Sequence, residues 1–568
     1  MTTIKKTKQN IVGKINKALG GKVKVHESDL ILPPDVKMGD LSFPLFNLAK
    51  EVKANPAQLA GELAQKIKPC STVKEIKAVG PYLNFILQEK KLVQGVLAEI
   101  SNQPKTKKTG KTIMLEFAHP NTHKAFHIGH LRNIVTGESL ARILEHAGHK
   151  VVRANYQGDV GMHIAKCLWG VTQLSKELVK AEKGAIDAKV AFLGKAYAYG
   201  SENFEKNKKK QAEIIEFNKR IYDADESIKK LYSKTRQWSL DYFDKIYQRV
   251  LTKFDRLYFE SETFQAGKKI VLDCVKRGVF KESEGAIIFE GDKHGLHNRV
   301  FINSEGYPTY EAKDMALAKL QFQEYHPEKI IHVVGPEQIE YFKVIFRALE
   351  YVLPQSKDKE IHLAYGWVRL KAGKMSSRLG NVILGEWLLD EVKKEILKLV
   401  KKSKEIKNQA ETAEKISLAA VKFSILKNGL TRDIAFDINE SINLSGNSGP
   451  YILYTYARIQ SILRKANKPK NILTAKQLAI DILAQEKSLA FKLAQFPEVT
   501  AQAAEKFEPS LIAKYLFELS QNFNDYYHQT PILKAEAEKA FRLALIEAVA
   551  QVVQQGSHLL GFETVEKM

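Results

Sequence analysis

Residues 120–130 read Pro-Asn-Thr-His-Lys-Ala-Phe-His-Ile-Gly-His, and the pattern around them decides the fold of the chain. Immediately before them, apolar residues alternate with others over 112–117, which predicts a half-buried strand. After them, apolar residues recur at helical spacing over 131–147, and Gly148 stands where such a helix would end. A second strand is predicted over 151–156. The order is therefore strand, loop, helix and strand, with two histidines at the start of the helix.

The start of this predicted helix is a favourable place for a phosphate group. Backbone N–H groups at a helix N-terminus lack partners within the helix, and the helix dipole adds partial positive charge there. His127 and His130 add two imidazoles, and Gly129 between them leaves room for a base or ribose against the backbone. Two histidines three residues apart are commonly surface or capping residues. The preceding Pro-Asn pair, Lys124 and the strand–helix frame favour a nucleotide site instead.

This first motif resembles the nucleotide-binding signature of class I aminoacyl-tRNA synthetases. Its longer form, Pro-Asn-x-x-Lys-x-x-His-x-Gly-His, resembles that of the arginyl-tRNA synthetases. A second motif, Lys-Ala-Gly-Lys-Met-Ser-Ser-Arg-Leu-Gly-Asn over 371–381, follows a strand predicted over 362–368. It resembles the class I loop Lys-Met-Ser-Lys-Ser, which closes over ATP. A basic loop suits adenylyl transfer, because catalysis there is mainly positioning and electrostatic stabilisation.

The second motif departs from the class I pattern at one charged position. Ser377 stands where most class I enzymes have a second lysine, and Arg378 replaces the final serine. Arginyl enzymes commonly lack that lysine, and the lysine just before their first motif is thought to supply the lost charge. Lys124 occupies that position. The departure therefore supports the arginine branch, with Lys124, Lys374 and Arg378 sharing the triphosphate.

Length, charge and cysteine content limit the class of protein. The 568 residues suffice for three or more domains. Lys and Arg number 88 against 65 Asp and Glu, and the net charge of +23 favours a nucleic-acid partner over a merely solubilising charge. Three cysteines without Cys-x-x-Cys spacing argue for a reducing compartment and against a disulfide framework or zinc site.

The cellular location of the protein is predicted from the absence of membrane-spanning and targeting segments in the sequence. No apolar run approaches the roughly 20 residues that span a bilayer. The first 17 residues are rich in lysine, but they contain no arginine and no apolar signal core. We therefore expect a cytoplasmic protein without a membrane partner.

We expect a multidomain α/β fold with three main parts. A small α+β domain is predicted over residues 1–103. A Rossmann-like catalytic domain with a parallel sheet is predicted over 111–385, and it includes a charged helical insertion at about 171–265. From about 385 onwards the sequence is almost wholly helical, with a connection over 386–435 and an α-helical bundle over 436–568.

The two outer parts resemble arginyl-tRNA synthetases as well. The Gly39-Asp40 turn, the Asn55-Pro56 helix start and the Gly-Pro-Tyr-Leu-Asn-Phe strand at 80–85 resemble the N-terminal domain that contacts the tRNA elbow. The helix start at Gly449-Pro450 resembles the anticodon-binding bundle. Aromatic residues at helical spacing are more often core than binding surface. The resemblance adds that bases stack on exposed ones, such as Tyr526 or Tyr527.

The resemblance implies an arginine–tRNA ligase. ATP and L-arginine would form arginyl-AMP and pyrophosphate, and the arginyl group would pass to the terminal adenosine of tRNA(Arg). Mg²⁺ is expected to accompany ATP, without a dedicated metal site in the protein. A monomer is expected.

The resemblance also assigns residues. The expected catalytic residues are Lys124, His127, His130 and Lys374. The expected ATP-binding residues are His127, Gly129, His130, Lys374, Met375, Ser376 and Arg378. The expected arginine-binding residues are Glu116, Asn121, Tyr310, Asp314 and Gln338, in which the Asp314 carboxylate pairs with the guanidinium.

Several alternatives stay open at this stage. Tyr310 and Asp314 are four residues apart on a predicted helix, where a surface pair is the ordinary interpretation. Glu116 is alternatively a solvent-facing strand residue. The chain as a whole is alternatively a class I synthetase of another specificity, such as glutaminyl or cysteinyl, or a non-catalytic tRNA-binding paralogue. The absence of zinc-spaced cysteines opposes the cysteinyl reading, and the presence of His127, His130 and Lys374 opposes the paralogue.

Overall fold

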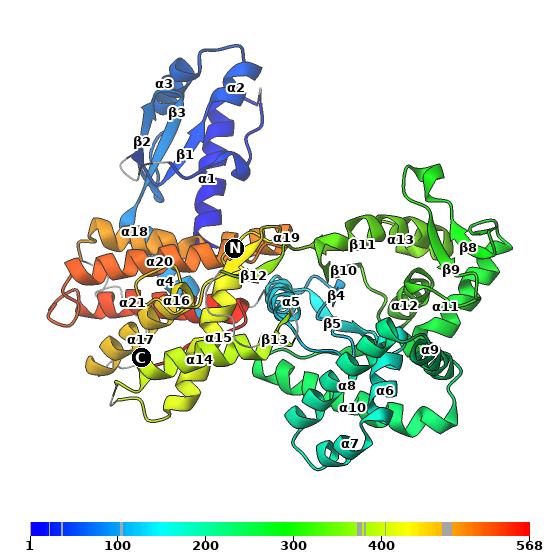
Figure 1. Cartoon of the computed structure of the whole chain (residues 1–568). Coiled ribbons are helices and arrows are strands. Elements are labelled where there is room, and N and C mark those ends of the chain that lie inside the picture. The colour runs from blue at the N-terminus through cyan, green and yellow to red at the C-terminus, as the bar shows by residue number, and fades with distance from the viewer. Residues whose placement is uncertain are drawn as a thin grey trace.

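The computed structural model describes most of the chain (Figure 1). The described residues are 2–21, 23–33, 35, 38–102, 106–371, 378–379, 382–403, 405–467 and 480–568. The expectations for Lys374, Met375 and Ser376 lie outside these ranges, and the side chain of Arg378 lies outside the described part as well.

The N-terminal block is a small α+β domain, as predicted. Its antiparallel sheet has the order β1-β3-β2, and the Asn55 side chain caps α3 by accepting the N–H groups of Ala57 and Gln58. The sequence did not predict β2. The elements are α1 (Thr3–Ala18), β1 (Leu41–Pro44), α2 (Phe46–Glu51), α3 (Pro56–Lys66), β2 (Val73–Val79), β3 (Tyr82–Leu87) and α4 (Glu89–Asn102), with a 3-10 turn at Glu27–Asp29.

A five-stranded parallel sheet forms the centre of the catalytic part. Its order is β11-β10-β4-β5-β6, so the strand that precedes the first motif lies in the middle. The expectation that this strand is half-buried is wrong. Ile113 to Glu116 are all buried, because both faces of a parallel sheet are covered by other elements. The strands are β4 (Thr112–Glu116), β5 (Lys150–Gln157), β6 (Arg256–Phe259), β10 (Lys329–Val334) and β11 (Glu360–Ala364).

Helices connect and surround this sheet (Figure 1). The predicted first helix is α5 (Ile128–His146), with His127 as its N-cap and Ala147 as its C-cap. The helical insertion comprises α6 (Met162–Gln173), α7 (Ser175–Glu182), α8 (Ile186–Lys206), α9 (Lys208–Tyr222) and α10 (Glu226–Arg249). The insertion expected to extend to about 265 gives way earlier to β6, a sheet strand that the sequence analysis did not predict.

A smaller layer follows β6 in the chain. It holds α11 (Glu260–Val275), β7 (Lys281–Ser283), β8 (Ala286–Phe289), β9 (Arg299–Ile302), α12 (Tyr310–Tyr325) and α13 (Ile339–Val352), with 3-10 turns at Gly291–His294, Pro336–Gln338 and Pro354–Ser356. Strands β7, β8 and β9 form a separate antiparallel sheet. The predicted helix that carries Tyr310 and Asp314 is confirmed as α12.

The remainder is mainly helical, with two corrections. The strand expected over 362–368 is divided between β11 and β12, and residues 434–436 of the expected helical run form β15, which pairs with β12. The elements are β12 (Val368–Leu370), β13 (Arg378–Leu379), β14 (Val382–Ile383), α14 (Gly385–Val400), α15 (Gln409–Leu426), β15 (Ile434–Phe436), α16 (Ile438–Ser441), α17 (Gly449–Lys465), α18 (Ala484–Ala494), α19 (Phe496–Lys506), α20 (Ser510–Gln529) and α21 (Lys539–Leu559).

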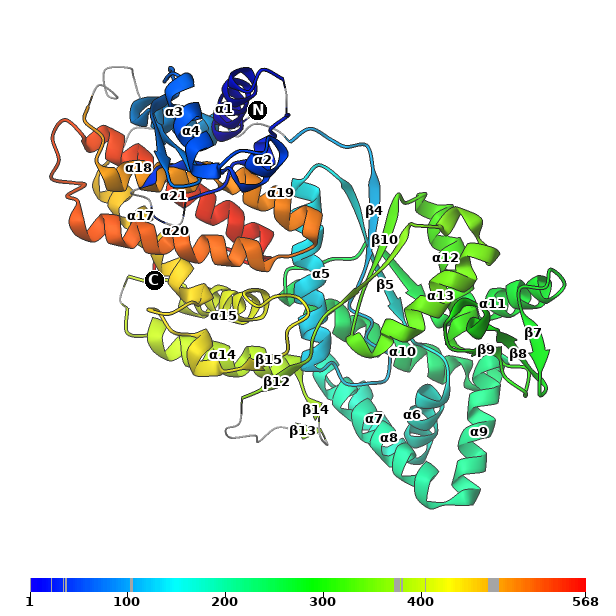
Figure 2. The same cartoon turned by 90° about the horizontal axis from the view of Figure 1, so that it is seen from above.

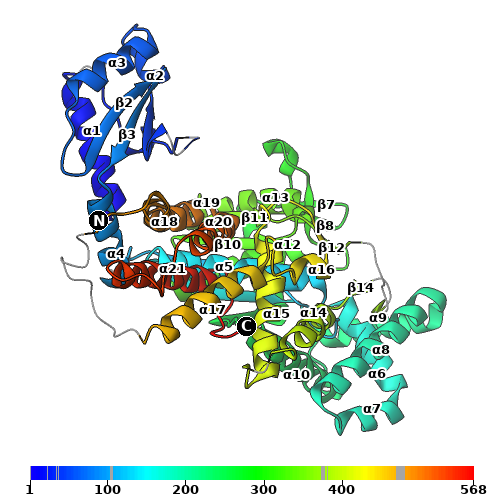
Figure 3. The same ribbon diagram turned by 90° about the vertical axis from the view of Figure 1, so that its left-hand side faces the viewer.

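The N-terminal block stands off from the catalytic part and is attached to the C-terminal bundle (Figure 3). Helix α4 packs against α18 and α21 of the bundle. Two ion pairs add to this contact, Lys8 with Glu498 at 2.8 Å and Lys487 with Asp40 at 2.7 Å. Within the described ranges, no helix is long and apolar enough to cross a membrane.

Helix α5 runs between the sheet and the C-terminal bundle (Figure 2). Ser139 Oγ donates to the Leu559 carbonyl at 2.9 Å, and Arg142 donates to the His558 carbonyl at 3.1 Å and to the Leu251 carbonyl at 2.6 Å. Buried Lys422 on α15 likewise donates to the carbonyls of Val250 and Gly561. These side chains therefore donate to carbonyls at the carboxyl ends of both α10 and α21, which lack donors within their own helices.

Candidate active site

The two histidines of the first motif cap helix α5 reciprocally. His127 Nδ1 accepts the backbone N–H of Gly129 at 3.1 Å and that of His130 at 3.4 Å, while His130 Nδ1 accepts the N–H of His127 at 3.2 Å. The two rings stack with their centroids 3.7 Å apart. Because each Nδ1 is an acceptor, a neutral ring carries its proton on Nε2.

Both rings are neutral near pH 7. Burial lowers the pKa of His127, with Lys124 adding to the effect. Burial lowers the pKa of His130 well below its usual range, and His127, His119 and Lys124 contribute further. The helix start therefore offers two neutral imidazole N–H donors, while the backbone N–H groups of His127, Gly129 and His130 are already bonded to the two rings.

Gly129 is required by the ring of His127. A Cβ atom at position 129 would lie 2.9 Å from His127 Cε1 and 3.0 Å from its Nδ1. The first contact is closer than real Cβ atoms show and the second is tight, so a side chain would require the ring that caps the helix to shift. This reason differs from the access to a nucleotide that sequence reasoning suggested.

The loop ahead of the helix has a strained backbone. Ala118, His119 and His123 have φ values of 83°, 51° and 61°, which non-glycine residues rarely adopt and which cost of order 1–3 kcal/mol each. Ala118 N–H donates to Asn133 Oδ1 at 2.6 Å and His119 N–H to Asn155 Oδ1 at 3.1 Å. These hydrogen bonds to α5 and β5 hold the strained loop in place.

Helix α10 of the insertion holds the middle of the same loop. His123 N–H donates to Ser239 Oγ at 3.0 Å, and His123 Nε2 lies 2.8 Å from Thr235 Oγ1. Burial lowers the pKa of His123 to about 3, so this ring is neutral and structural. The insertion therefore shapes the first motif directly.

A cavity of about 460 Å³ lies at the carboxyl ends of β4, β5 and β10, beside this loop. Ligands of parallel α/β sheets bind at this edge. All five residues predicted to bind arginine line the cavity: Glu116, Asn121, Tyr310, Asp314 and Gln338. Residues that are 222 positions apart in the chain, such as Glu116 and Gln338, are therefore brought to one place.

Asp314 lies in this cavity on α12. Its carboxylate accepts a hydrogen bond of 2.7 Å from the Tyr341 hydroxyl, and within the described chain it has no ion-pair partner. Burial raises the pKa of Asp314 to about 7, and the negative charges of Glu116 and Glu311 act in the same direction. A cation bound here would stabilise the ionised form.

Glu116 is buried in the same cavity and has partners on both oxygens. His332 Nδ1 lies 3.0 Å from its Oε1, and the Gln321 side chain donates to its Oε2. The other ring nitrogen of His332 lies 2.7 Å from Glu360 Oε2. The solvent-facing alternative for Glu116 is therefore wrong, since its side chain is only 4% exposed.

Sequence reasoning missed His332, Glu360 and Tyr341. One signal was available: His332 interrupts the apolar run of β10, where a polar side chain needs a buried partner. The identity of its partners was not available from local sequence. The partners of His332 are set by the register of the neighbouring strands. In that register His332 lies opposite Glu116 on β4 and His362 on β11.

Lys124 and Asn121 lie between the cavity and the helix start. Asn121 Oδ1 accepts the N–H of Gly158 at 3.2 Å. Lys124 is half-buried, and burial lowers its pKa with a further contribution from Lys166, whereas Glu260 opposes the shift. Glu260 itself is ion-paired to Lys313 at 2.7 Å. Lys124 consequently has no close ion pair among the residues described, and its charge is available to a ligand.

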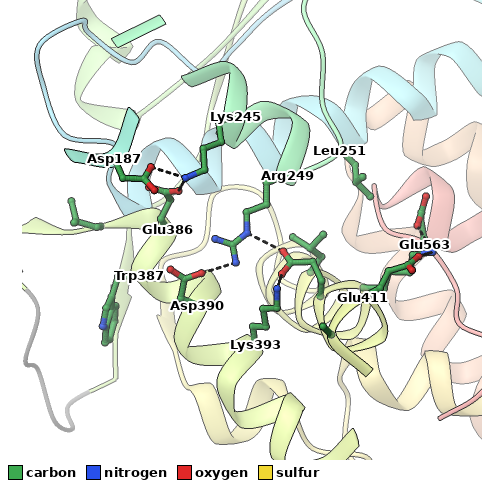
Figure 4. A pocket seen from close by; sticks show the side chains of 15 residues that line it. Asp187, Lys245, Arg249, Leu251, Glu386, Trp387, Asp390, Lys393, Glu411 and Glu563 are labelled. Carbon is green, nitrogen blue, oxygen red and sulfur yellow. Dashed lines mark hydrogen bonds and ion pairs between the residues drawn. The ribbon is translucent and has the colours of Figure 1, made fainter. Parts of the chain in front are cut away.

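A second cavity, of about 930 Å³, lies between α10, α14 and α15 (Figure 4). It contains none of the predicted site residues, and its charges satisfy one another. Figure 4 shows Arg249 beside Asp390 at 2.7 Å and Lys245 beside Asp187 at 2.6 Å. We therefore interpret it as an interface that ties the insertion to the helices after the second motif.

Comparison with known proteins gives the family. Residues 92–438 match the model of the catalytic domain of class I tRNA synthetases (R), 452–568 match the DALR anticodon binding domain, and 5–87 match the arginyl tRNA synthetase N-terminal domain. The chain is 33% identical to the arginine–tRNA ligase of Treponema denticola over 100% of both chains. It is also 33% identical to that of Clostridium perfringens, over 94% of this chain and 95% of the relative.

A solved structure agrees with these matches. The arginyl-tRNA synthetase of Thermus thermophilus superposes with a TM-score of 0.82 at 26% identity, covering 99% of this chain and 100% of that one. The expected multidomain α/β fold with an N-terminal domain and a helical C-terminal bundle is confirmed. The chain therefore belongs to the arginyl-tRNA synthetase family of class I tRNA synthetases.

Proposed function

We propose that this chain is an arginine–tRNA ligase, which joins L-arginine to tRNA(Arg) at the expense of ATP. The observation that carries the proposal is the cavity in which Asp314, an acidic group without a cation partner among the described residues, lies with Glu116 and Tyr310. A guanidinium is planar and always charged, so a buried carboxylate is the group that recognises it best.

The other end of the substrate has partners nearer the first motif. Asn121 and Gln338 bind the α-amino and carboxylate groups of arginine in this proposal, since both line the same cavity. His127 and His130 donate from Nε2 to the α-phosphate as the arginine carboxylate attacks it. Fixed donors aimed at developing charge are among the largest contributions to catalysis.

ATP occupies the α5 start, with His127, Gly129 and His130, and the second motif, with Lys374, Met375, Ser376 and Arg378. Lys124 adds charge beside the triphosphate, because it stands at the loop that leads into α5. We propose that Mg²⁺ arrives bound to the ATP phosphates, since Mg²⁺ keeps several waters and is commonly held by substrate phosphates. Within the described chain, no cluster of three or more His, Cys, Asp or Glu side chains offers a metal site.

The anticodon is read in the C-terminal bundle in this proposal. A cavity of about 540 Å³ there holds Arg458, whose guanidinium lies over the rings of Tyr454 at 4.7 Å and Tyr527 at 5.2 Å. Base stacking on Tyr527 suits such a surface. Stacking on Tyr526, which sequence reasoning allowed, is wrong, because Tyr526 is 1% exposed and its hydroxyl donates to Glu486.

The tRNA elbow meets the N-terminal block in the same proposal. Phe46 is 51% exposed and packs edge-on against Tyr82, with ring centroids 5.6 Å apart. The net charge of +23 supports a polyanionic partner of this size. We further propose a cytoplasmic monomer.

The test is aminoacylation of tRNA with each of the standard amino acids, together with ATP–pyrophosphate exchange with and without tRNA. Charging with arginine alone is the expected result, and exchange is expected with arginine only when tRNA is present. Charging with a different amino acid would assign another class I specificity, and the absence of any charging would indicate a non-catalytic relative.

The catalytic efficiency of the enzyme for arginine, kcat/KM, should fall at acidic pH. Asp314 in the empty cavity has a pKa raised to about 7, so the carboxylate that the guanidinium needs is progressively protonated below that pH. We expect kcat/KM for arginine to be level above pH 7 and to fall about tenfold per pH unit below it.

The measurement is kcat/KM for arginine against pH, with kcat/KM for ATP at saturating arginine as the comparison. His332 stays protonated, because Glu116 and Glu360 raise its pKa to about 10, so it does not produce this acid limb. An arginine profile that stays level down to about pH 5.5 would show that another group, with a usual carboxyl pKa, receives the guanidinium.

A further inference from the structure

We infer that His332 is a positioning residue that holds Glu116 and Glu360 together and so leaves Asp314 as the carboxylate that receives the arginine guanidinium. The inference rests on the proposed function and deepens it. His332 contacts no part of the reacting centre in this account. It acts through the two carboxylates that it bridges.

The geometry of His332 is that of a bridge. It lies on β10 between β4 and β11, with Nδ1 3.0 Å from Glu116 Oε1 and Nε2 2.7 Å from Glu360 Oε2. The side chain of His332 is only 9% exposed, and Phe342 on α13 packs against the ring at a centroid distance of 5.2 Å. His332, Glu116 and Glu360 all line the cavity, so the bridge forms part of its wall.

The bridge requires a charged imidazole. Ionised carboxylates only accept hydrogen bonds, so both ring nitrogens must carry protons to donate to Glu116 and Glu360. Burial alone would lower the pKa of His332, but the two carboxylates raise it to about 10. Burial instead lowers the pKa of its two neighbouring histidines, His119 and His362, so neither supplies a competing cation.

The remaining charged groups of the cavity are neutralised in pairs. Glu311 is paired with Arg299 at 3.0 Å, and Glu260 with Lys313 at 2.7 Å. Glu337 lines the cavity but is exposed to solvent. Asp314, which is half-buried, is thus the carboxylate in the cavity wall, apart from the exposed Glu337, that lacks a cation within the described chain.

The other polar groups that face Asp314 are uncharged. Tyr341 on α13 donates to it, and Tyr156 on β5 has a pKa well above its usual value because of burial and nearby carboxylates. The electrostatic surroundings of Asp314 are therefore set by Glu116 and Glu311, which raise its pKa, and by His332, which lowers it.

Removing the charge of His332 should change arginine binding and spare the chemistry. In His332→Gln, Glu116 loses its cation and competes with Asp314 as a second acidic group. We expect KM for arginine to rise about tenfold or more, with kcat and KM for ATP within about twofold of wild type. The acid limb of kcat/KM for arginine should move to higher pH, since the pKa of Asp314 rises when the positive charge is lost.

A second variant gives a shift of opposite sign. Glu360→Gln keeps a hydrogen-bond acceptor for His332 but removes one negative charge from the cluster. The acid limb should then move to lower pH, because the imidazolium is less neutralised and favours ionised Asp314. His362→Gln is the matched control, since His362 lies opposite His332 on β11 and also packs against Phe342, at 4.6 Å between ring centroids, but its side chain hydrogen-bonds the Val334 carbonyl at 3.3 Å instead of a carboxylate.

The outcomes are decisive for the inference and separate it from the proposed function. Opposite shifts of the acid limb in folded His332→Gln and Glu360→Gln, with none in His362→Gln, support it. An unshifted limb, or shifts of the same sign, would overturn it. If His332→Gln does not fold, the Glu360→Gln shift alone decides. Failure of the wild-type protein to charge tRNA with arginine would instead overturn the proposed function.

Discussion

Replacing Asp314 with alanine is expected to raise KM for arginine by about two to three orders of magnitude, with little change in KM for ATP. The guanidinium would enter a cavity whose other acidic groups, apart from the exposed Glu337, are paired with His332, Arg299 and Lys313. Leaving a buried charge without its partner costs about 2–5 kcal/mol, and about 1.4 kcal/mol corresponds to a factor of ten. The measurement is arginine-dependent ATP–pyrophosphate exchange in the presence of tRNA.

Two further variants sharpen this experiment. Asp314→Asn keeps an acceptor for the Tyr341 hydroxyl and removes only the charge, so a similar loss would assign the effect to charge. Asp273→Ala is the control, because Asp273 is an exposed aspartate on the adjacent helix α11, outside the cavity. Near-normal KM for arginine in Asp314→Ala would remove Asp314 from the guanidinium site.

His130→Ala should lower kcat of adenylate formation by about 10²–10³-fold and leave KM for arginine nearly unchanged. The substitution removes the Nε2 donor that we assign to the α-phosphate, and loss of one fixed donor of this kind typically costs about that much. It also removes the acceptor of the His127 N–H, a helix cap worth about 1 kcal/mol of stability.

The two contributions are separable. His130→Asn places a side-chain acceptor at the same position, so we expect thermal stability to recover while kcat stays low. His297→Ala, a substitution of an exposed histidine after the 3-10 turn Gly291–His294, is the control. If His130→Asn restored kcat along with stability, the ring would be a cap and not a catalytic donor.

Local patterns predicted the part of the site that local interactions build. The spacing of apolar residues over 131–147 and the position of Gly148 predicted α5, because a helix depends on contacts three and four residues apart. The loop with Asn121 and Lys124 could be identified from its motif. Roles for Tyr310, Asp314 and Gln338 came from resemblance, since nothing in their own segments distinguishes them.

Long-range pairing explains what the sequence analysis missed. Strand β15 forms because it pairs with β12, and strand β6 forms because it pairs with β5. The Glu116–His332–Glu360 bridge joins residues that are 216 and 28 positions apart through strand register. Tyr526 is buried by other helices of the bundle, and helical periodicity alone does not predict how those helices are arranged.

The contacts of Arg142 and Ser139 bear on how the chain is completed during synthesis. Their acceptors, the carbonyls of His558 and Leu559, are made 416 and 420 residues later. Domains generally fold in the order in which the ribosome makes them. Here the helix that carries the first motif obtains its final hydrogen bonds only after the anticodon-binding bundle has been translated. An incomplete, ribosome-bound chain therefore lacks the native packing of α5, and full assembly of the nucleotide site is a late event in translation.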